Sequence, residues 1–135
     1  MSVRNILMVA AGAVAEWVWT PRESVRDWRS VASSSDGTKL VAVANNDKIY
    51  TSTDSGVGWT ARGSARNWYS VASSSDGTKL VAVAYNGQIY TSTDSGVSWT
   101  PRESVRSWYS VASSSDGTKL VAVVYSGQIY TSVLA

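Results

Sequence analysis

The 135-residue sequence contains no cysteine and no histidine. A chain without cysteine cannot build a disulfide framework, and a chain without either residue cannot form a zinc site of the usual kind. The absence of histidine also excludes Ser-His-Asp and Cys-His catalytic units. Much of enzyme chemistry is therefore excluded, and we predict no catalytic residue, no metal and no cofactor.

Charge and long apolar runs are also scarce. Charged residues make up 16% of the sequence and the net charge is +2, which is unlike a polybasic nucleic-acid-binding tail. No stretch after residue 15 approaches the roughly 20 apolar residues of a membrane span. We therefore expect neither nucleic acid nor a membrane as a partner. The hydrophobic share of 44% is enough for one domain with a buried core.

The first fifteen residues, MSVRNILMVAAGAVA, differ in character from the rest of the chain. A basic residue, an apolar stretch and small residues follow one another, which is the layout of a secretory signal. The same segment could instead be a structural element, such as a short apolar helix or a remnant strand. A signal would place the protein outside the cytoplasm, and a structural element would leave it inside.

Residues 16–135 form an internal repeat. The fourteen residues SVASSSDGTKLVAV begin at Ser30, Ser70 and Ser110 without a change, so the period is forty residues. The repeats run over about 30–69, 70–109 and 110–135. A period of this length is typical of solenoids, propellers and arrays, in which each unit packs against its neighbours. Such near-identical repeats indicate a recently amplified or engineered protein.

Each complete repeat contains four strand-like runs separated by turns. In the middle repeat the turns are Asp76-Gly77, Asn86-Gly87 and the run from Asp94 to Gly96. The second run, around LVAVA, is apolar on both sides, which indicates a sheet that is covered on both faces. We therefore predict an all-β fold, a β-propeller of four-stranded antiparallel blades with three blade equivalents per chain.

The turn after the third strand carries a motif that occurs twice. Its residues are Ser52, Asp54, Gly56 and Trp59 in one copy, and Ser92, Asp94, Gly96 and Trp99 in the other. This pattern resembles the Asp-box of the bacterial neuraminidase repeat family, whose blades occur in sialidases, sortilin-like receptors and photosystem II assembly factors. The resemblance implies a structural turn in which the aspartate accepts backbone hydrogen bonds. It implies fold far more than activity.

The third repeat stops after its third strand, at GQIYTSVLA. The matching fourth strand is found at the N-terminus, where WVWTPRES at residues 17–24 aligns with VSWTPRES at residues 97–104. Because three blades cannot surround an axis, we expect identical chains to assemble into a ring, with the 17–24 strand completing the third blade of a neighbour. A dimer with six blades is favoured over a trimer with nine.

Positive charge gathers in the segments that connect successive blades. These segments hold seven arginines against three acids, a local charge of +4. In sialidases the face opposite the Asp-boxes holds the active site, so the resemblance points to the same face here. The residues that we predict for ligand binding on that face are Arg22, Arg26, Trp28, Arg62, Arg66, Trp68, Tyr85, Asn86, Arg102, Arg106, Trp108 and Tyr125. Packing between blades is the alternative role for the tryptophans and the arginine stems.

These observations favour a non-catalytic binding or interaction scaffold. An anionic glycan or an acidic protein surface would suit clustered guanidinium groups with aromatic neighbours. A multivalent lectin-like propeller is the alternative, and a sialidase-like glycosidase remnant is a weaker one. Catalysis is not expected because the blades are near copies: Glu23 and Glu103 share one register, which Gly63 occupies in the middle repeat.

Overall fold

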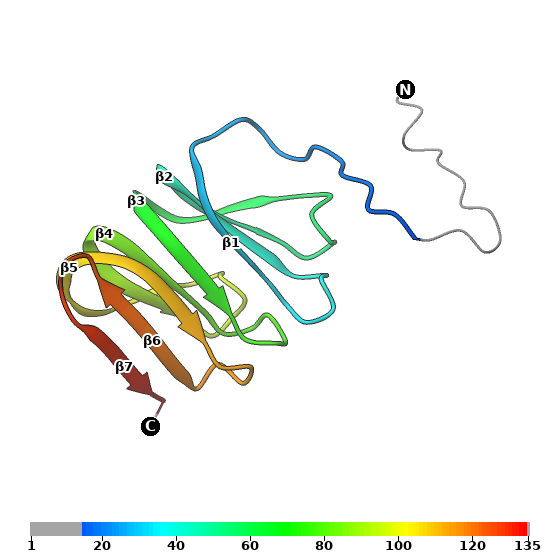
Figure 1. Cartoon of the computed structure of the whole chain (residues 1–135). Helices are drawn as coiled ribbons and strands as arrows, with labels where there is room; N and C mark the ends of the chain where they lie inside the picture. The colour runs from blue at the N-terminus through cyan, green and yellow to red at the C-terminus, as the bar shows by residue number, and fades with distance from the viewer. Residues whose placement is uncertain (1–14, 135) are drawn as a thin grey trace.

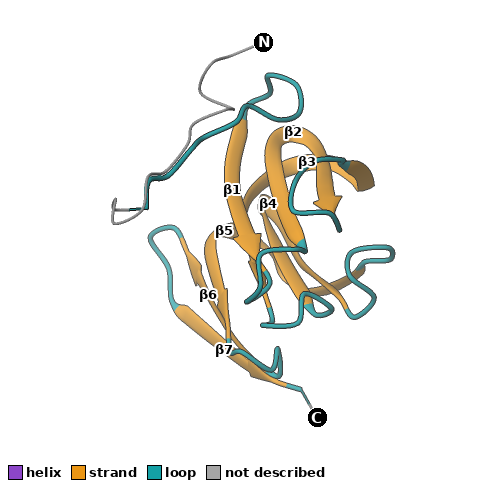
Figure 2. Cartoon of the chain, turned by 90° about the vertical axis from the view of Figure 1, so that its right-hand side faces the viewer, coloured by secondary structure: helices purple, strands orange, loops and turns teal. Residues whose placement is uncertain are grey.

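The computed structural model describes residues 15–134. Most of the signal-like N-terminal segment, residues 1–14, lies outside the described residues, so neither interpretation of it is tested. The described chain folds into seven strands, which are β1 (Trp28–Ser33), β2 (Leu40–Ser52), β3 (Thr60–Ser73), β4 (Leu80–Ser92), β5 (Thr100–Ser113), β6 (Lys119–Val124) and β7 (Ile129–Val133). Residues 15–134 contain no helix, and hence none that could cross a membrane (Figure 2).

Each strand pairs antiparallel with the next, so the order in space is β1 to β7. The pairs group into three layers that correspond to the repeats: blade 1 (residues 28–62), blade 2 (68–102) and blade 3 (108–133). Figure 1 shows the layers side by side, with the blue N-terminal segment and the red β7 on opposite sides of the view. Blade 3 has three strands, because no described residues pair with the outer edge of β7.

The strand boundaries differ from the predicted ones at two kinds of position. The second and third strands of blades 1 and 2 run together as β2 and β4, and the chain reverses at Asn46 and Asn86, which have φ of 54° and 55°. In blade 3 the same reversal, at Ser126, separates β6 from β7. Likewise, the fourth strand of one blade continues into the first strand of the next within β3 and β5.

The core lies between the blades, as the two-sided apolar pattern predicts. Residues Leu80–Ala84 of β4 are all buried. Leu80, Ala82 and Ala84 pack with Val41, Val43 and Ile49 of blade 1, whereas Val83 packs with Trp108 and Ala122 of blade 3. Blade 2 is therefore covered on both faces.

Small side chains let the first strands of neighbouring blades approach closely. The backbone N–H of Val71 donates to the Ser30 hydroxyl at 3.3 Å, and that of Val111 donates to the Ser70 hydroxyl at 3.3 Å. Just beyond the C-terminal ends of β3 and β5, the backbone N–H of Ser75 donates to the Ser115 carbonyl at 2.6 Å. The serine-rich sequence of the first strand is thus explained by contacts that a larger side chain would block.

Candidate binding surface

Antiparallel strands place alternate turns at opposite ends of a blade. One end carries the SSDGTK turns and the turns at residues 52–59 and 92–99, which we call the Asp-box turns after the motif that they resemble. The other end carries the blade-to-blade segments 23–28, 63–68 and 103–108, together with the turns at residues 45–47, 85–87 and 125–127. We call this second end the connection face. It is the face on which the sequence predicts ligand binding.

The three blade-to-blade segments share one backbone conformation. Glu23, Gly63 and Glu103 occupy the same place in the repeat and have φ of 52°, 63° and 51°. This left-handed region costs free energy for any residue except glycine. The two glutamates partly offset that cost, because each carboxylate accepts a hydrogen bond from the next backbone N–H, Ser24 at 2.9 Å and Ser104 at 3.1 Å.

A tryptophan, a tyrosine and an arginine form one cluster in every blade. Trp28, Trp68 and Trp108 each donate an indole N–H to a carbonyl four residues earlier, at 3.2, 3.3 and 3.1 Å. Each tryptophan meets a tyrosine edge to face, with ring centroids 5.3, 5.2 and 5.1 Å apart. The paired tyrosines are Tyr50, Tyr90 and Tyr130. Because Trp68 and Trp108 are fully buried, they are found packed between blades, which is the alternative that the sequence left open.

The second arginine of each connection lies over the tyrosine of this cluster. The guanidinium carbons of Arg26, Arg66 and Arg106 are 4.6, 4.6 and 5.0 Å from the ring centroids. Among residues 15–134, ion pairs occur only in the first repeat, between Arg26 and both Asp47 (3.0 Å) and Glu23 (3.5 Å), and between Arg29 and Asp27. Glycine replaces Asp47 in the other repeats, so Arg66 and Arg106 keep a positive charge that no carboxylate of the described chain neutralises.

The first arginine of each connection points elsewhere. The Nε atoms of Arg62 and Arg102 donate to the hydroxyls of Thr51 and Thr91 on the neighbouring third strand, at 3.2 and 2.9 Å. The side chains therefore lie along the sheet, away from the stacked arginines. Arg22 is exposed, and the structure gives it no comparable partner within residues 15–134. The guanidinium groups of the two arginines in one connection therefore do not converge on a shared site.

Four tyrosines from blades 2 and 3 form a cluster near the connection face. Tyr69 stacks on Tyr85 with centroids 4.8 Å apart and meets Tyr109 edge to face at 5.4 Å. Tyr109 and Tyr125 are 49% and 61% exposed and lie 5.8 Å apart. Tyr85 and Tyr125 are predicted site residues. Tyr69 and Tyr109 were missed, although the repeat places each next to a predicted tryptophan.

Arg29 extends this tyrosine cluster into the first repeat. It occupies the place of Tyr69 and Tyr109, and its guanidinium carbon lies 4.7 Å from the Tyr69 ring centroid. Next to the cluster, the side-chain oxygen of Asn86 accepts a hydrogen bond from the Ser107 hydroxyl at 3.0 Å. Asn86 is itself exposed.

The Asp-box turns have the geometry of a structural turn. Asp94 accepts hydrogen bonds from the Ser92 hydroxyl at 2.8 Å and from the Ser98 backbone N–H at 2.9 Å, and the Trp99 indole donates to the Gly96 carbonyl. Asp54, Ser52, Gly56 and Trp59 repeat this arrangement. The Ser98 hydroxyl adds one more bond to Asp94, at 2.5 Å, which Gly58 cannot supply to Asp54.

These hydrogen bonds stabilise ionised aspartates. The pKa of Asp94 falls from 3.8 to about 2, with the Ser98 hydroxyl as the largest cause. The pKa of Asp54 is also lowered, mainly by the Gly58 backbone N–H. Residues 15–134 contain no group of three or more Asp or Glu side chains that could hold a metal ion. Asp54 and Asp94 accept these hydrogen bonds from residues of their own turns.

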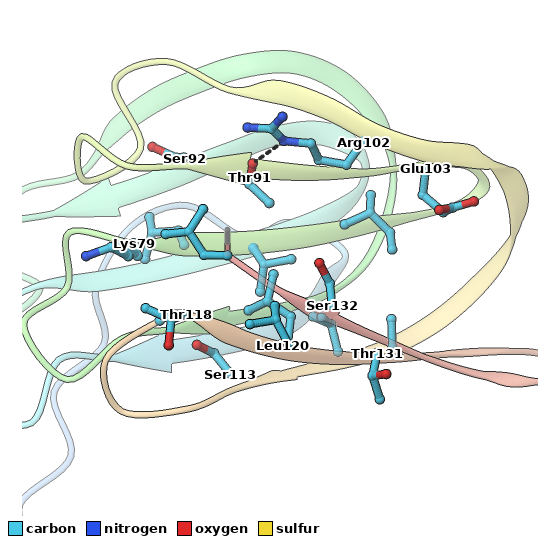
Figure 3. Close-up of a pocket in the computed structure, with 18 of the residues that line it drawn as sticks. Lys79, Thr91, Ser92, Arg102, Glu103, Ser113, Thr118, Leu120, Thr131 and Ser132 are labelled. Carbon is cyan, nitrogen blue, oxygen red and sulfur yellow. Dashed lines mark hydrogen bonds between the residues drawn. The ribbon is translucent and has the colours of Figure 1, made fainter.

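A cleft of about 330 Å³ lies between blades 2 and 3 (Figure 3). Leu80, Val81 and Ile89 line its blade 2 side, and Leu120 and Tyr130 line its blade 3 side. Figure 3 shows Arg102 and its bond to Thr91 along one wall, with Glu103 at the end of that wall. The equivalent space between blades 1 and 2, around Leu40, Thr51 and Leu80, is only about 10 Å³.

Comparison with solved structures identifies the architecture. No family model and no curated protein matches the sequence. The structure is similar to YCF48 bound to a D1 peptide, with a TM-score of 0.67, 17% identity, and 84% of this chain and 43% of that chain covered. It is similar to the Cps50 (Swd1) β-propeller domain of Myceliophteria thermophila, with a TM-score of 0.68, 13% identity, and coverage of 84% and 37%. The chain folds as β-propeller blades.

A glycosidase also shares this architecture. The chain is similar to the GH74 enzyme of Niastella koreensis, with a TM-score of 0.62, 30% identity, and 85% of this chain and 17% of that chain covered. The chain thus spans between 17% and 43% of the length of these three proteins. The prediction of an all-β propeller fold is confirmed, whereas the predicted ligand-binding residues stay predictions.

Proposed function

We propose that this chain is a non-catalytic propeller scaffold that binds an anionic partner on its connection face. The observation that carries the proposal is the position of Arg66 and Arg106. Both lie over tyrosine rings on that face, and neither has a carboxylate partner among the described residues. Stacking holds each guanidinium in place, and Arg66 is exposed while Arg106 is half-buried, which suits recognition of carboxylate, sulfate or phosphate groups.

An acidic protein surface or an acidic glycan would supply such groups. The likeness to YCF48, whose structure contains a bound D1 peptide, supports a peptide or protein partner. We further propose that copies of the chain form a ring, a six-bladed dimer in preference to a nine-bladed trimer. Equivalent sites would then repeat around the ring, and several weak contacts would act together.

The state of the carboxyl groups supports a non-catalytic role. A glycosidase needs one carboxyl group with a raised pKa as its general acid. In residues 15–134 every resolved carboxyl shift is downward, and hydrogen bonds to the ionised form are its main cause. The absence of histidine removes another common acid or base.

The test uses immobilised heparin and an immobilised poly-glutamate peptide as two anionic probes. Replacing Arg66 and Arg106 together by Gln should weaken binding at least about tenfold and reduce its salt dependence. Arg26→Gln is the matched control, because it removes the same tyrosine stacking from an arginine that Asp47 already neutralises. Unchanged affinity and salt dependence in the double variant would reject the proposal. Tighter binding to heparin would indicate a glycan partner, and tighter binding to poly-glutamate would indicate a protein partner.

A lectin-like role is the second candidate, and the exposed tyrosine cluster favours it. Sugar rings stack on aromatic side chains, and Tyr109 and Tyr125 present about half or more of their surface. Screening on an array of neutral and acidic glycans separates the two functions. Tyr109→Ala with Tyr125→Ala should abolish binding of a neutral sugar while leaving heparin binding intact. Failure of every neutral glycan to bind would remove this candidate.

A further inference from the structure

The two ends of the blade stack expose side chains whose equivalents are buried. Val71 is 5% exposed because it packs against blade 1, whereas its equivalent Val31, at the open end of blade 1, is 72% exposed. Ile49 is fully buried against blade 2, whereas Ile129, on the open face of blade 3, is 71% exposed. The open ends are thus the two halves of the interface that already joins blade 1 to blade 2.

The cleft between blades 2 and 3 also lacks a side chain that fills the equivalent space elsewhere. Between blades 1 and 2 the equivalent space is nearly closed, and Trp99 packs against that core. Trp99 directly precedes β5, which supplies the fourth strand of blade 2, and lies beside Gly63 and the Gly96 turn. The equivalent of Gly63 at the next interface is Glu103, which lines the open cleft. The cleft therefore marks the place where a fourth-strand tryptophan of blade 3 would lie.

Residues 17–24 carry that tryptophan. At an offset of eighty residues, Trp19 aligns with Trp99, and Thr20, Pro21 and Arg22 align with an identical run of β5. These residues have no regular structure in the single chain, and Trp19 is 78% exposed. The segment that follows them nevertheless has the full blade-to-blade conformation, with φ of 52° at Glu23 and the Trp28 indole bonded to the Ser24 carbonyl. It is folded as a connection from a preceding blade.

We infer that the cleft between blades 2 and 3 is the docking site for Trp19 of a second copy of this chain. This inference rests on the proposed ring and specifies how the ring closes. The register follows from the pairing of β4 with β5, where Thr91 lies opposite Thr100 and Ile89 opposite Arg102. By equivalence, Thr131 of one copy lies opposite Thr20 of the other.

The same equivalence specifies two contacts that accompany Trp19. The Nε atom of Arg22 from the second copy donates to the Thr131 hydroxyl, as Arg102 does to Thr91. Val31 of the second copy packs under blade 3, as Val71 packs under blade 1. The apolar faces at both ends and the outer edge of β7 are then covered, which removes an exposed strand edge.

The first experiment measures self-association by light scattering over a range of concentrations. The wild-type chain should give a multiple of 14.4 kDa. Trp19→Ala should weaken self-association at least about tenfold, since a tryptophan that fills a pocket is a typical interface hot spot. Trp17→Ala is the matched control, because its equivalents Val57 and Val97 are exposed in the complete blades, and it should change the mass little.

The second experiment tests the register without relying on a destabilised variant. The chain contains no cysteine, so a variant carrying Thr20→Cys and Thr131→Cys has only these two thiols. Directly opposed strand residues lie within disulfide range, so mild oxidation should link different copies covalently. Thr20→Cys combined with Ser126→Cys is the control, because Ser126 lies in the turn between β6 and β7, and it should stay unlinked.

Each outcome bears on a different statement. A folded wild-type monomer at all concentrations would overturn both the ring and the docking of Trp19. An oligomer that keeps its mass with Trp19→Ala and fails to crosslink through residues 20 and 131 would overturn the docking alone. Neither outcome would affect binding of heparin or poly-glutamate through Arg66 and Arg106, which is measured separately.

Discussion

At the scale of single residues, the repeats provide their own matched comparisons. The two Asp-box turns differ at one position, Gly58 or Ser98, and only Ser98 adds a side-chain hydrogen bond to the aspartate. The difference is visible in the pKa values, since Asp94 falls to about 2 with the Ser98 hydroxyl as its largest cause. The hydroxymethyl group of Ser98 thus supplies a hydrogen bond that the hydrogen atom of Gly58 cannot.

Exchanging these two residues tests that role. Ser98→Gly should raise the pKa of Asp94 toward 3.8 and lower the melting temperature by about 2 °C, because one charge-assisted hydrogen bond is lost. Gly58→Ser should do the opposite at Asp54, since Gly58 has no left-handed backbone to forbid a side chain. Carboxyl NMR titration gives the pKa values. If the pKa of Asp94 in Ser98→Gly and the pKa of Asp54 in Gly58→Ser both stayed at their wild-type values, the role assigned to the Ser98 hydroxyl would be wrong.

Acid should destabilise the protein through the same aspartates. The pKa values of Asp94 and Asp116 are lowered in the folded state to about 2, by Ser98 and by the Thr118 backbone N–H respectively. A lowered folded pKa means that the stabilisation is complete above about pH 4 and is lost as the pH falls toward 2. Melting temperatures should therefore fall from pH 5 to pH 2. The fall should be smaller in Asp94→Asn, because residue 94 then no longer takes up a proton. A flat profile for the wild-type chain would contradict this.

At the scale of elements, the blade-to-blade segments are the most informative part of the fold. A left-handed residue, a tryptophan whose indole donates to the carbonyl four residues earlier and a stacked arginine recur in all three, including the one that has no preceding blade among the described residues. The first connection is held by contacts with the blade that follows it, such as Arg26 over Tyr50 and Trp28 against the same ring. Packing against a preceding blade is not required for its conformation.

The left-handed position allows a direct test. Gly63→Ala should destabilise the protein by about 1 kcal/mol, because a β-carbon is unfavourable at φ of 63° even though space is available for it. Glu103→Gly is the reciprocal change and should leave the free energy of unfolding unchanged or raise it, since relief of strain offsets one exposed hydrogen bond. Urea denaturation measures both. A loss in Glu103→Gly as large as that in Gly63→Ala would show that the glutamate contact outweighs the strain.

At the scale of the whole molecule, the proposed ring would join the blade 3 end of one copy to the blade 1 end of the next. A head-to-tail contact of this kind closes a ring only if the rotation per chain divides the circle, and otherwise continues as a filament. Six blades lie within the usual range of four to eight for propellers, whereas nine lie beyond it. In the proposed ring, the angle between blades would fix the number of copies.

A tandem chain distinguishes the two rings. Two copies joined through an Asp-box turn, so that β7 of the first leads into Trp17 of the second, contain six blade equivalents in one polypeptide. If the proposed ring is a dimer, this tandem chain should be monomeric in solution and have the hydrodynamic radius of the wild-type assembly. If the ring has nine blades, the tandem chain should instead form larger assemblies. Sedimentation velocity of both proteins gives the answer.

The sequence by itself determined the repeat, the strand order and the propeller fold. The forty-residue period fixes which residues are equivalent, and the two-sided apolar pattern of Leu80–Ala84 requires a sheet covered on both faces. Turn residues fixed the reversals, because Asn86, Gly77 and Gly96 adopt the positive φ that the turns need. These features depend on local chemistry, which a single sequence carries in full.

Only the tertiary structure decided how the candidate site is divided. Two arginines of one connection look alike in sequence, yet Arg62 lies along the sheet toward Thr51 and Arg66 stacks on Tyr90 of the next blade. The tyrosine cluster joins residues from different strands and blades, and the cleft exists because two identical repeats meet different neighbours. Identical sequences cannot encode such differences, because burial depends on what packs against each blade.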